Sequence, residues 1–216
     1  MKPATALPLN LHLKRAALAL ALVGTALLAS CATAPLPQQW VRLPAKGSLP
    51  AAPTLPALPT SASAGAQVWQ LMGAVTLPGH LDRDALLVPR GSAGLQPLPG
   101  ARWAEPLRDA VPRLLRSDLA GALGSPVWQA PLPPGVRPTH QLRVELLALD
   151  VAADGASVLL QARWSVASAD GASPPRIDEA AFRMAATGND AAALATAHRD
   201  AVQALALRIA AAARLR

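Results

Sequence analysis

Cys31 is the residue of this sequence whose type and surroundings most clearly indicate a defined chemistry. It is the only cysteine among 216 residues, so it has no partner in the chain for a disulfide or a metal-binding pair. It follows an apolar stretch, 16–29, which Lys14 and Arg15 precede. A positive segment followed by an apolar one is the layout of a secretory signal. We therefore expect an exported chain in which the thiol of Cys31 is modified.

The residues next to the thiol indicate which modification it receives. Leu28, Ala29, Ser30 and Cys31 resemble the bacterial lipobox, in which a branched apolar residue and two small residues precede the cysteine. The resemblance implies that Cys31 receives a diacylglycerol, that the chain is cut before it, and that the new amino group is acylated. Ala32 follows where Asp commonly means retention in the inner membrane, so the resemblance favours the periplasmic face of the outer membrane.

Three other interpretations of the leader compete with lipidation. A transmembrane anchor would need about 30 Å of apolar helix, whereas the stretch 16–29 provides about 21 Å. An ordinary signal could be cut after Ala34, but Pro35 would then follow the cleaved bond, where its fixed φ suits a protease poorly. A purely structural Cys31 would have no partner.

The rest of the chain carries no recognisable catalytic or metal-binding pattern. His80, His140 and His198 share no ligand spacing with each other, and neither a phosphate-binding glycine loop nor a nucleophile elbow occurs. His198 lies on the apolar stripe of a predicted helix, where we expect a hydrogen-bonded packing residue. We expect ion pairs at Asp82, Arg83 and Glu105. The sequence thus predicts a protein that is not an enzyme and that has no cofactor besides the acyl chains.

The positive charge of the chain does not indicate a nucleic-acid partner. The formal charge is +7, and about +4 remains once the leader with Lys2, Lys14 and Arg15 is set aside. The basic residues after Cys31 are almost all Arg and are spread along the chain, whereas nucleic-acid binding calls for a patch or a run.

Three segments follow from these patterns. Residues 1–30 form the signal peptide, and residues 31–66 form a lipidated, Pro-rich tether or loop with a possible first strand over 39–43. Its prolines favour extended polyproline-type chain. Residues 67–216 form one domain, which is long enough to bury a core of aliphatic and Trp side chains.

Within that domain the spacing of apolar residues predicts strands and two helices. Short strands are expected near 69–77 and 85–88, a loop over 91–100, and a helix from about Asp109, as its N-cap, to Gly124. Period-2 alternation predicts an antiparallel meander of three strands, and a final helix begins after Asn189 or Asp190. The expected fold is α+β: an antiparallel sheet with two amphipathic helices packed on one face.

Two motifs together carry a family resemblance. One includes Leu81, Asp82 and Arg83, and the other, RWAEPL, begins with Arg102 and Trp103 and continues through Glu105 and Pro106. Behind a lipobox, this pairing resembles the ABC-type transport auxiliary lipoproteins, the PqiC-like family. The resemblance implies that these residues have a structural or partner-binding role.

The resemblance also implies a function. Such lipoproteins are expected to work with an MCE-domain substrate-binding protein and an inner-membrane transporter that move lipids between the membranes, and a homo-oligomer is plausible. The alternative is an outer-membrane lipoprotein that activates or scaffolds another periplasmic machine, a cell-wall synthase or a secretion channel.

Overall fold

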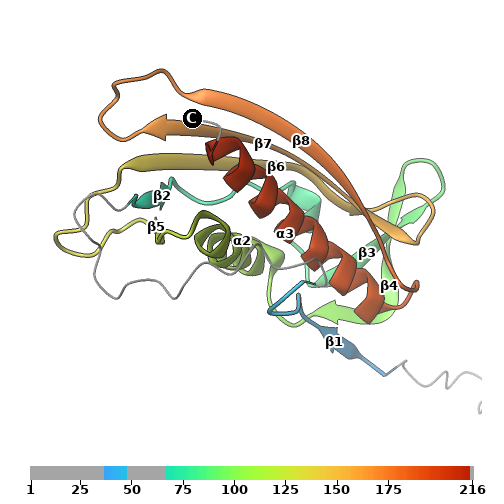
Figure 1. Cartoon of the computed structure of the whole chain (residues 1–216). Helices are drawn as coiled ribbons and strands as arrows, with labels where there is room; N and C mark the ends of the chain where they lie inside the picture. Colours follow the sequence, from blue (N-terminus) through green and yellow to red (C-terminus); the bar gives the residue numbers. More distant parts are fainter. Residues whose placement is uncertain (1–36, 48–66, 215–216) are drawn as a thin grey trace, which may run out of the picture. The chain divides into compact units, whose positions relative to one another are not determined.

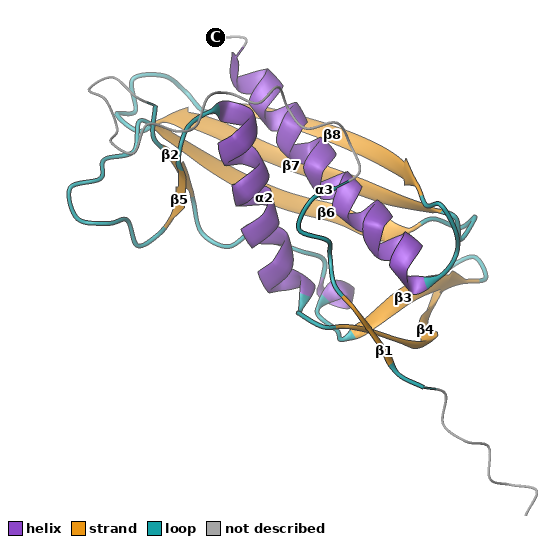
Figure 2. Cartoon of the chain, turned by 60° about the horizontal axis from the view of Figure 1, so that its bottom comes forward, coloured by secondary structure: helices purple, strands orange, loops and turns teal. Residues whose placement is uncertain are grey.

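The protein has the α+β fold that its sequence predicts. The structure is a computed structural model, and it describes residues 37–47 and 67–214. Two long helices lie side by side against one face of a five-stranded sheet, and a smaller three-stranded sheet lies beside them (Figures 1 and 2). The leader, the lipobox with Leu28, Ala29 and Ser30, Cys31 and most of the Pro-rich segment lie outside the described residues.

In the described residues, eight strands make up two sheets. The small sheet has the order β1-β4-β3, with the bounds β1 Gln39–Val41, β3 Ala85–Arg90 and β4 Gly94–Trp103. The large sheet has the order β5-β2-β6-β7-β8, with the bounds β2 Trp69–Leu71, β5 Val127–Gln129, β6 His140–Val151, β7 Ser157–Ser168 and β8 Arg176–Ala185. The helices are the short 3-10 turn η2 Gly79–Leu81, α2 Leu107–Leu123 and α3 Ala191–Arg214.

The predicted antiparallel meander is β6-β7-β8, and its two turns use the expected residues. Asp154 accepts a hydrogen bond from the backbone N–H of Ala156, and the adjacent Gly155 has a φ of 65°, which glycine adopts without steric cost. The expectation of a purely antiparallel sheet is wrong, because β2 pairs in parallel with both β5 and β6. β2 is also shorter than predicted, and Thr76 rejoins the sheet only by one isolated bridge to Glu145.

The segment 91–100 is not the loop that its glycines and prolines predict. Only a tight turn after Arg90 interrupts it, and β4 then pairs antiparallel with β3, for example Pro97 with Leu87. Pro97 and Pro99 are compatible with a strand here, because β1 pairs with β4 only from Ala101 onward. At the prolines β4 is therefore an edge strand and needs no second ladder of hydrogen bonds.

Helix α2 begins earlier than predicted. Pro106, not Asp109, is its N-cap residue, and the carbonyl of Pro106 accepts hydrogen bonds from the N–H groups of both Asp109 and Ala110. Pro112 thus lies inside the helix and cannot donate to the carbonyl of Arg108, one turn before it. Burial of the apolar face of α2 compensates for this loss.

Helix α3 begins and packs as its pattern predicts. The carboxylate of Asp190 accepts a hydrogen bond of 2.8 Å from the N–H of Ala193 and so caps the helix. The predicted apolar stripe is buried: Leu194, Ala201, Val202, Leu205 and Ile209.

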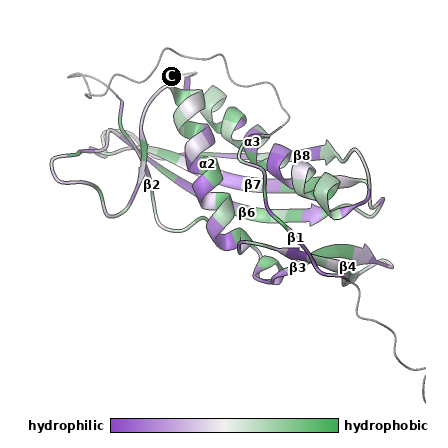
Figure 3. Cartoon of the chain, turned by 90° about the horizontal axis from the view of Figure 1, so that it is seen from below, coloured by the Kyte–Doolittle hydropathy of each residue, from purple (hydrophilic) through white to green (hydrophobic). Residues whose placement is uncertain are grey.

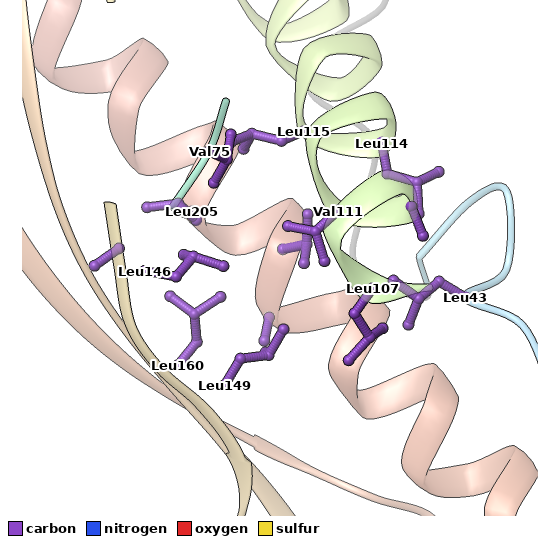
Figure 4. Close-up of a cluster of buried hydrophobic side chains, with 14 of the residues drawn as sticks. Leu43, Val75, Leu107, Val111, Leu114, Leu115, Leu146, Leu149, Leu160 and Leu205 are labelled. Atoms are coloured by element: carbon purple, nitrogen blue, oxygen red, sulfur yellow. The ribbon is translucent and has the colours of Figure 1, made fainter. Parts of the chain in front are cut away.

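The core lies between the two helices and the large sheet. Figure 4 shows Val111 and Leu115 of α2, Leu205 of α3, and Leu146 and Leu160 of the sheet converging on one another. Trp69, Trp103 and Trp164 are also buried, so three of the five tryptophans fill the core.

Candidate functional site

The two sequence motifs meet in the structure. The first continues from η2 toward β3, and the second joins the end of β4 to the start of α2. The N–H of Trp103 donates a hydrogen bond of 2.6 Å to the carbonyl oxygen of Asp84, and Ala85 pairs with Arg102 in the small sheet. Residues about 20 positions apart in the sequence therefore form one local unit.

Part of this unit is structural. Leu81 and Trp103 are buried, and the Trp103 ring meets the imidazole of His198 edge to face at 5.4 Å and 74°. Such edge-to-face contacts are favourable because the positive ring edge meets the negative face. Together with Pro106 as the N-cap of α2, these residues join the small sheet to both helices.

Two ion pairs attach the motifs to α2. Asp82 pairs with Arg108, and the hydrogen bond to Asp82 is the main cause that raises the pKa of Arg108. Glu105 pairs with Arg113, with 2.5 Å between Oε2 and Nη2 and a second hydrogen bond from Nε to Oε1 at 3.3 Å. The prediction of ion pairs is confirmed for Asp82 and Glu105. Arg83 makes none with any residue that the structure describes.

The remaining motif residues surround an open hollow of about 670 Å³ on the small sheet. Charged and polar side chains line it together with apolar side chains from β3 and β4. Its lining consists of His80, Asp82, Arg83, Asp84, Ala85, Leu87, Leu95, Pro97 and Arg102. Within residues 37–47 and 67–214, the guanidinium groups of Arg83 and Arg102 have no hydrogen-bonded or ionic partner. The hollow therefore offers two available cations beside an apolar surface.

His80 lines the hollow, and His198 lies beside the same segment, close to Ala85 and Leu87. The imidazole Nε2 of His80 hydrogen-bonds Oδ1 of Asp150 at 2.6 Å. Deeper in, Nδ1–H of the buried His198 donates to the carbonyl of Leu194 at 2.7 Å, as expected for a packing residue. Burial lowers the pKa of His198, against the opposing effects of the Leu194 carbonyl and the Asp150 carboxylate.

The cations and the apolar side chains of the hollow suit the binding of a partner. The imidazole of His80, which is paired with a carboxylate, is also a group that can act as a general base. Among the described residues that line the hollow there is no Ser, Thr or Cys. Among the described residues, no group of three His, Cys, Asp or Glu is placed to hold a metal ion. No helix in the described part of the chain is long and apolar enough to cross a membrane.

Sequence reasoning placed Asp82, Arg83 and Arg102 in the motifs but missed the apolar half of the hollow. Leu95 and Pro97 lie in the segment 91–100, which was predicted as a loop, whereas Leu87 lies in the predicted strand 85–88, which the structure confirms as β3. Residues 85–89 are apolar throughout, so the sequence held no alternation that would separate the outer face of this strand from the inner one. The partner of the buried Arg199, which is Asp118 on α2, was also not predicted.

The comparisons with known proteins agree with the fold. A crystal structure of an uncharacterized protein superposes with a TM-score of 0.62 at 14% identity, covering 82% of this chain and 99% of that one. A protein from Xanthomonas campestris, assigned to the family DUF330, superposes with a TM-score of 0.55 at 17% identity, covering 80% and 92%. No curated protein matches the chain.

The family follows from the sequence itself. Residues 48–210 match the family model described as the ABC-type transport auxiliary lipoprotein component, and they span most of the domain that contains both motifs. The predicted family is therefore confirmed: the chain belongs to the family of ABC-type transport auxiliary lipoproteins.

Proposed function

We propose that this protein is a lipid-anchored, non-enzymatic subunit of the outer membrane that docks an intermembrane lipid transporter there. The observation that carries the proposal is the family match over residues 48–210 in a chain whose Cys31 follows a lipobox-like sequence. Its partners are an MCE-domain substrate-binding protein and, through it, an inner-membrane ABC transporter.

The membrane attachment in this proposal depends on acylation of Cys31. One acyl chain gives only marginal binding, whereas a diacylglycerol together with an N-acyl chain holds a protein firmly, at about 0.8 kcal/mol for each buried CH₂ group. No membrane-spanning segment is then required after the anchor. Ala32 in place of Asp supports delivery to the outer membrane.

The compact domain suits a docking subunit. Its motifs use Leu81, Trp103, Glu105 and Pro106 to fix the small sheet against the helices, and they leave a hollow with two available guanidinium groups. These features support binding of a partner or a surface.

Crosslinking in intact envelopes tests the proposal. We expect the full chain, recovered from detergent extracts, to carry an MCE-domain protein and components of its transporter. The Cys31→Ser variant is expected to lose both acylation and the partner, whereas Ser30→Ala, which keeps a small residue at that place, retains both. Recovery of a cell-wall synthase or a secretion channel in place of the transporter would contradict the proposal.

A further inference from the structure

The small sheet has one closed face and one open face. Val41, Leu86 and Trp103 are buried and belong to the core. Trp40 pairs in register with Arg102, and Arg102 pairs with Ala85, so these three side chains lie on the opposite face. Arg102 and Ala85 line the hollow, which places Trp40 on the same face of the sheet as the hollow.

This open face combines exposed apolar side chains with available cations. We call it the outer patch, and it consists of Trp40, Arg83, Leu87, Leu95, Pro97 and Arg102. Trp40 is 59% exposed and Leu95 is 46% exposed, although both are large and apolar. Figure 3 shows hydrophobic and hydrophilic residues mixed along β3 and β4. A cluster of solvent-exposed apolar side chains marks a surface that binds another protein or a membrane.

The open face of the large sheet differs in its charges. There Arg163 pairs with Glu179, and at one end of the sheet Arg183 pairs with Asp154. Ile177 and Leu159 are exposed among these pairs. Arg143 also lies on that face without a partner among the described residues, but Glu145 and Glu179 lie on the same face. In the outer patch, Arg83 and Arg102 likewise have no partner among the described residues, so their guanidinium groups can accept anionic groups.

The short segment between Cys31 and Trp40 indicates which surface lies nearest to this face. Trp40 follows Cys31 by nine residues. A fully extended chain gains at most 3.3–3.6 Å per residue, so Trp40 stays within about 30 Å of the acylated cysteine. With Cys31 in the bilayer surface, as the proposed function requires, β1 is the first folded element that the membrane can meet.

The chemistry of the outer patch matches a phospholipid surface. Tryptophan favours the membrane–water interface because its ring is apolar and its N–H is polar. Guanidinium groups bind phosphate through two parallel hydrogen bonds. Asp82 is paired with Arg108, and Asp84, also in the hollow, suits the ammonium group of phosphatidylethanolamine.

We propose that the outer patch rests on the membrane that holds the acyl anchor, with Trp40 among the phospholipid headgroups and Arg83 and Arg102 against phosphates. This inference rests on the acylation of Cys31 in the proposed function. It assigns the domain an orientation: the small sheet faces the bilayer, and the other surfaces remain available to protein partners.

Tryptophan fluorescence tests the orientation directly. Only Trp40 and Trp128 are exposed among the five tryptophans, because Trp69, Trp103 and Trp164 are buried. The acylated protein is reconstituted into vesicles of phosphatidylethanolamine and phosphatidylglycerol whose acyl chains carry bromine, which quenches nearby tryptophans. Most of the quenching is expected to disappear in Trp40→Phe and to persist in the matched control Trp128→Phe.

A charge comparison sharpens this test. Arg83→Gln combined with Arg102→Gln is expected to reduce the quenching of Trp40, whereas Arg143→Gln combined with Arg163→Gln on the large sheet leaves it unchanged. Equal effects of the two pairs would overturn the role of the outer patch cations.

Three outcomes would overturn the inference, and they are distinguishable. If iodide in the water quenches Trp40 of the vesicle-bound protein, the patch is not on the membrane. If neither bromine nor iodide reaches Trp40, a second copy of the chain covers it. Both results leave the proposed function standing, because the protein remains bound to the vesicles. A native preparation without acyl chains would contradict the proposed function and this inference together.

Discussion

The two sheets of this protein follow the same alternation of side chains but differ in what covers them. The large sheet has its apolar face covered by α2 and α3, and its open face carries ion pairs such as Arg163–Glu179. The small sheet buries Val41 and Trp103 on one face and leaves Trp40 and Leu95 exposed on the other. The comparison indicates that apolar residues stabilise the fold in the large sheet, whereas some of those in the small sheet form an exposed contact surface.

A buried ion pair joins the two regions. On α3, Arg199 is 1% exposed, and its guanidinium donates to Asp118 of α2 at 2.6 and 2.7 Å. The same group donates to the carbonyl oxygens of Pro44 and Ala45, just after β1, at 2.9 and 3.1 Å. It therefore holds the segment that follows β1 against the helices.

We expect Arg199→Ala to have the largest effect on stability. It leaves the carboxylate of Asp118 without its partner and frees two carbonyl groups, and losing one member of a buried pair costs about 3–5 kcal/mol. Chemical denaturation measures this loss. The double variant Arg199→Met with Asp118→Leu is expected to lose less, because neither charge is then left alone. If Arg199→Ala were as stable as the wild type, the ion pair between Arg199 and Asp118 would not hold the two regions together.

Leu205→Ala tests the core beneath the large sheet. Leu205 is fully buried between α3 and the sheet (Figure 4), so its truncation leaves a cavity and costs about 2–5 kcal/mol. The midpoint and slope of urea unfolding report the change. Leu159→Ala, on the open face of the same sheet, is the matched control and should cost far less. Similar losses at both positions would contradict the assignment of inner and outer faces.

His198 should make stability depend on pH. Burial lowers its pKa in the folded state below the ordinary 6.5, so the unfolded chain binds the additional proton first. The free energy of unfolding is therefore expected to fall as the pH falls below about 6.5. The pKa values of Asp154 and Asp170 are also lowered, from the ordinary 3.8. These two carboxylates therefore change the free energy of unfolding only in a more acidic range. Denaturation of His198→Phe at several pH values should give a flatter profile between these two ranges, and an unchanged slope would show that another group is responsible.

The smallest effect on stability is expected in the outer patch. Trp40→Phe and Arg102→Gln change side chains on the open face of the small sheet, where substitutions are usually within about 0.5 kcal/mol. Thermal unfolding of the unreconstituted protein should thus hardly change, although Trp40→Phe removes the lipid-dependent quenching. A large loss of stability would mean that the patch is part of the core.

The sequence predicted the parts of the fold in which local pattern and burial agree. The meander β6-β7-β8 and helix α3 have regular apolar spacing and clear end signals, such as Asp190 and the glycines of the two turns. The parallel pairing of β2 was not predictable, because three residues carry no information about which strands lie beside them. The same applies to β1, whose direction relative to β4 depends on the whole fold.

The candidate site was predicted only in part, because its missing part also depends on which strands lie beside each other. The motifs identified Asp82, Arg83 and Arg102, but β4 was missed because Pro97 and Pro99 normally argue against a strand. The two prolines fit in β4 because only β3 pairs with it at those positions. Whether a second strand pairs there depends on where β1 lies in the fold. The role of Arg199 could not be predicted either, since its partners lie 81 and more residues away.

The lipid anchor and the proposed transport role both depend on the chemical state of Cys31. Mass spectrometry of the protein extracted from native membranes should find a first peptide that begins at residue 31 and carries a diacylglycerol and an N-linked acyl chain. The leader should be absent from it. A Cys31 without acyl groups, or one still joined to residues 1–30, would contradict the lipid anchor and the transport role that relies on it.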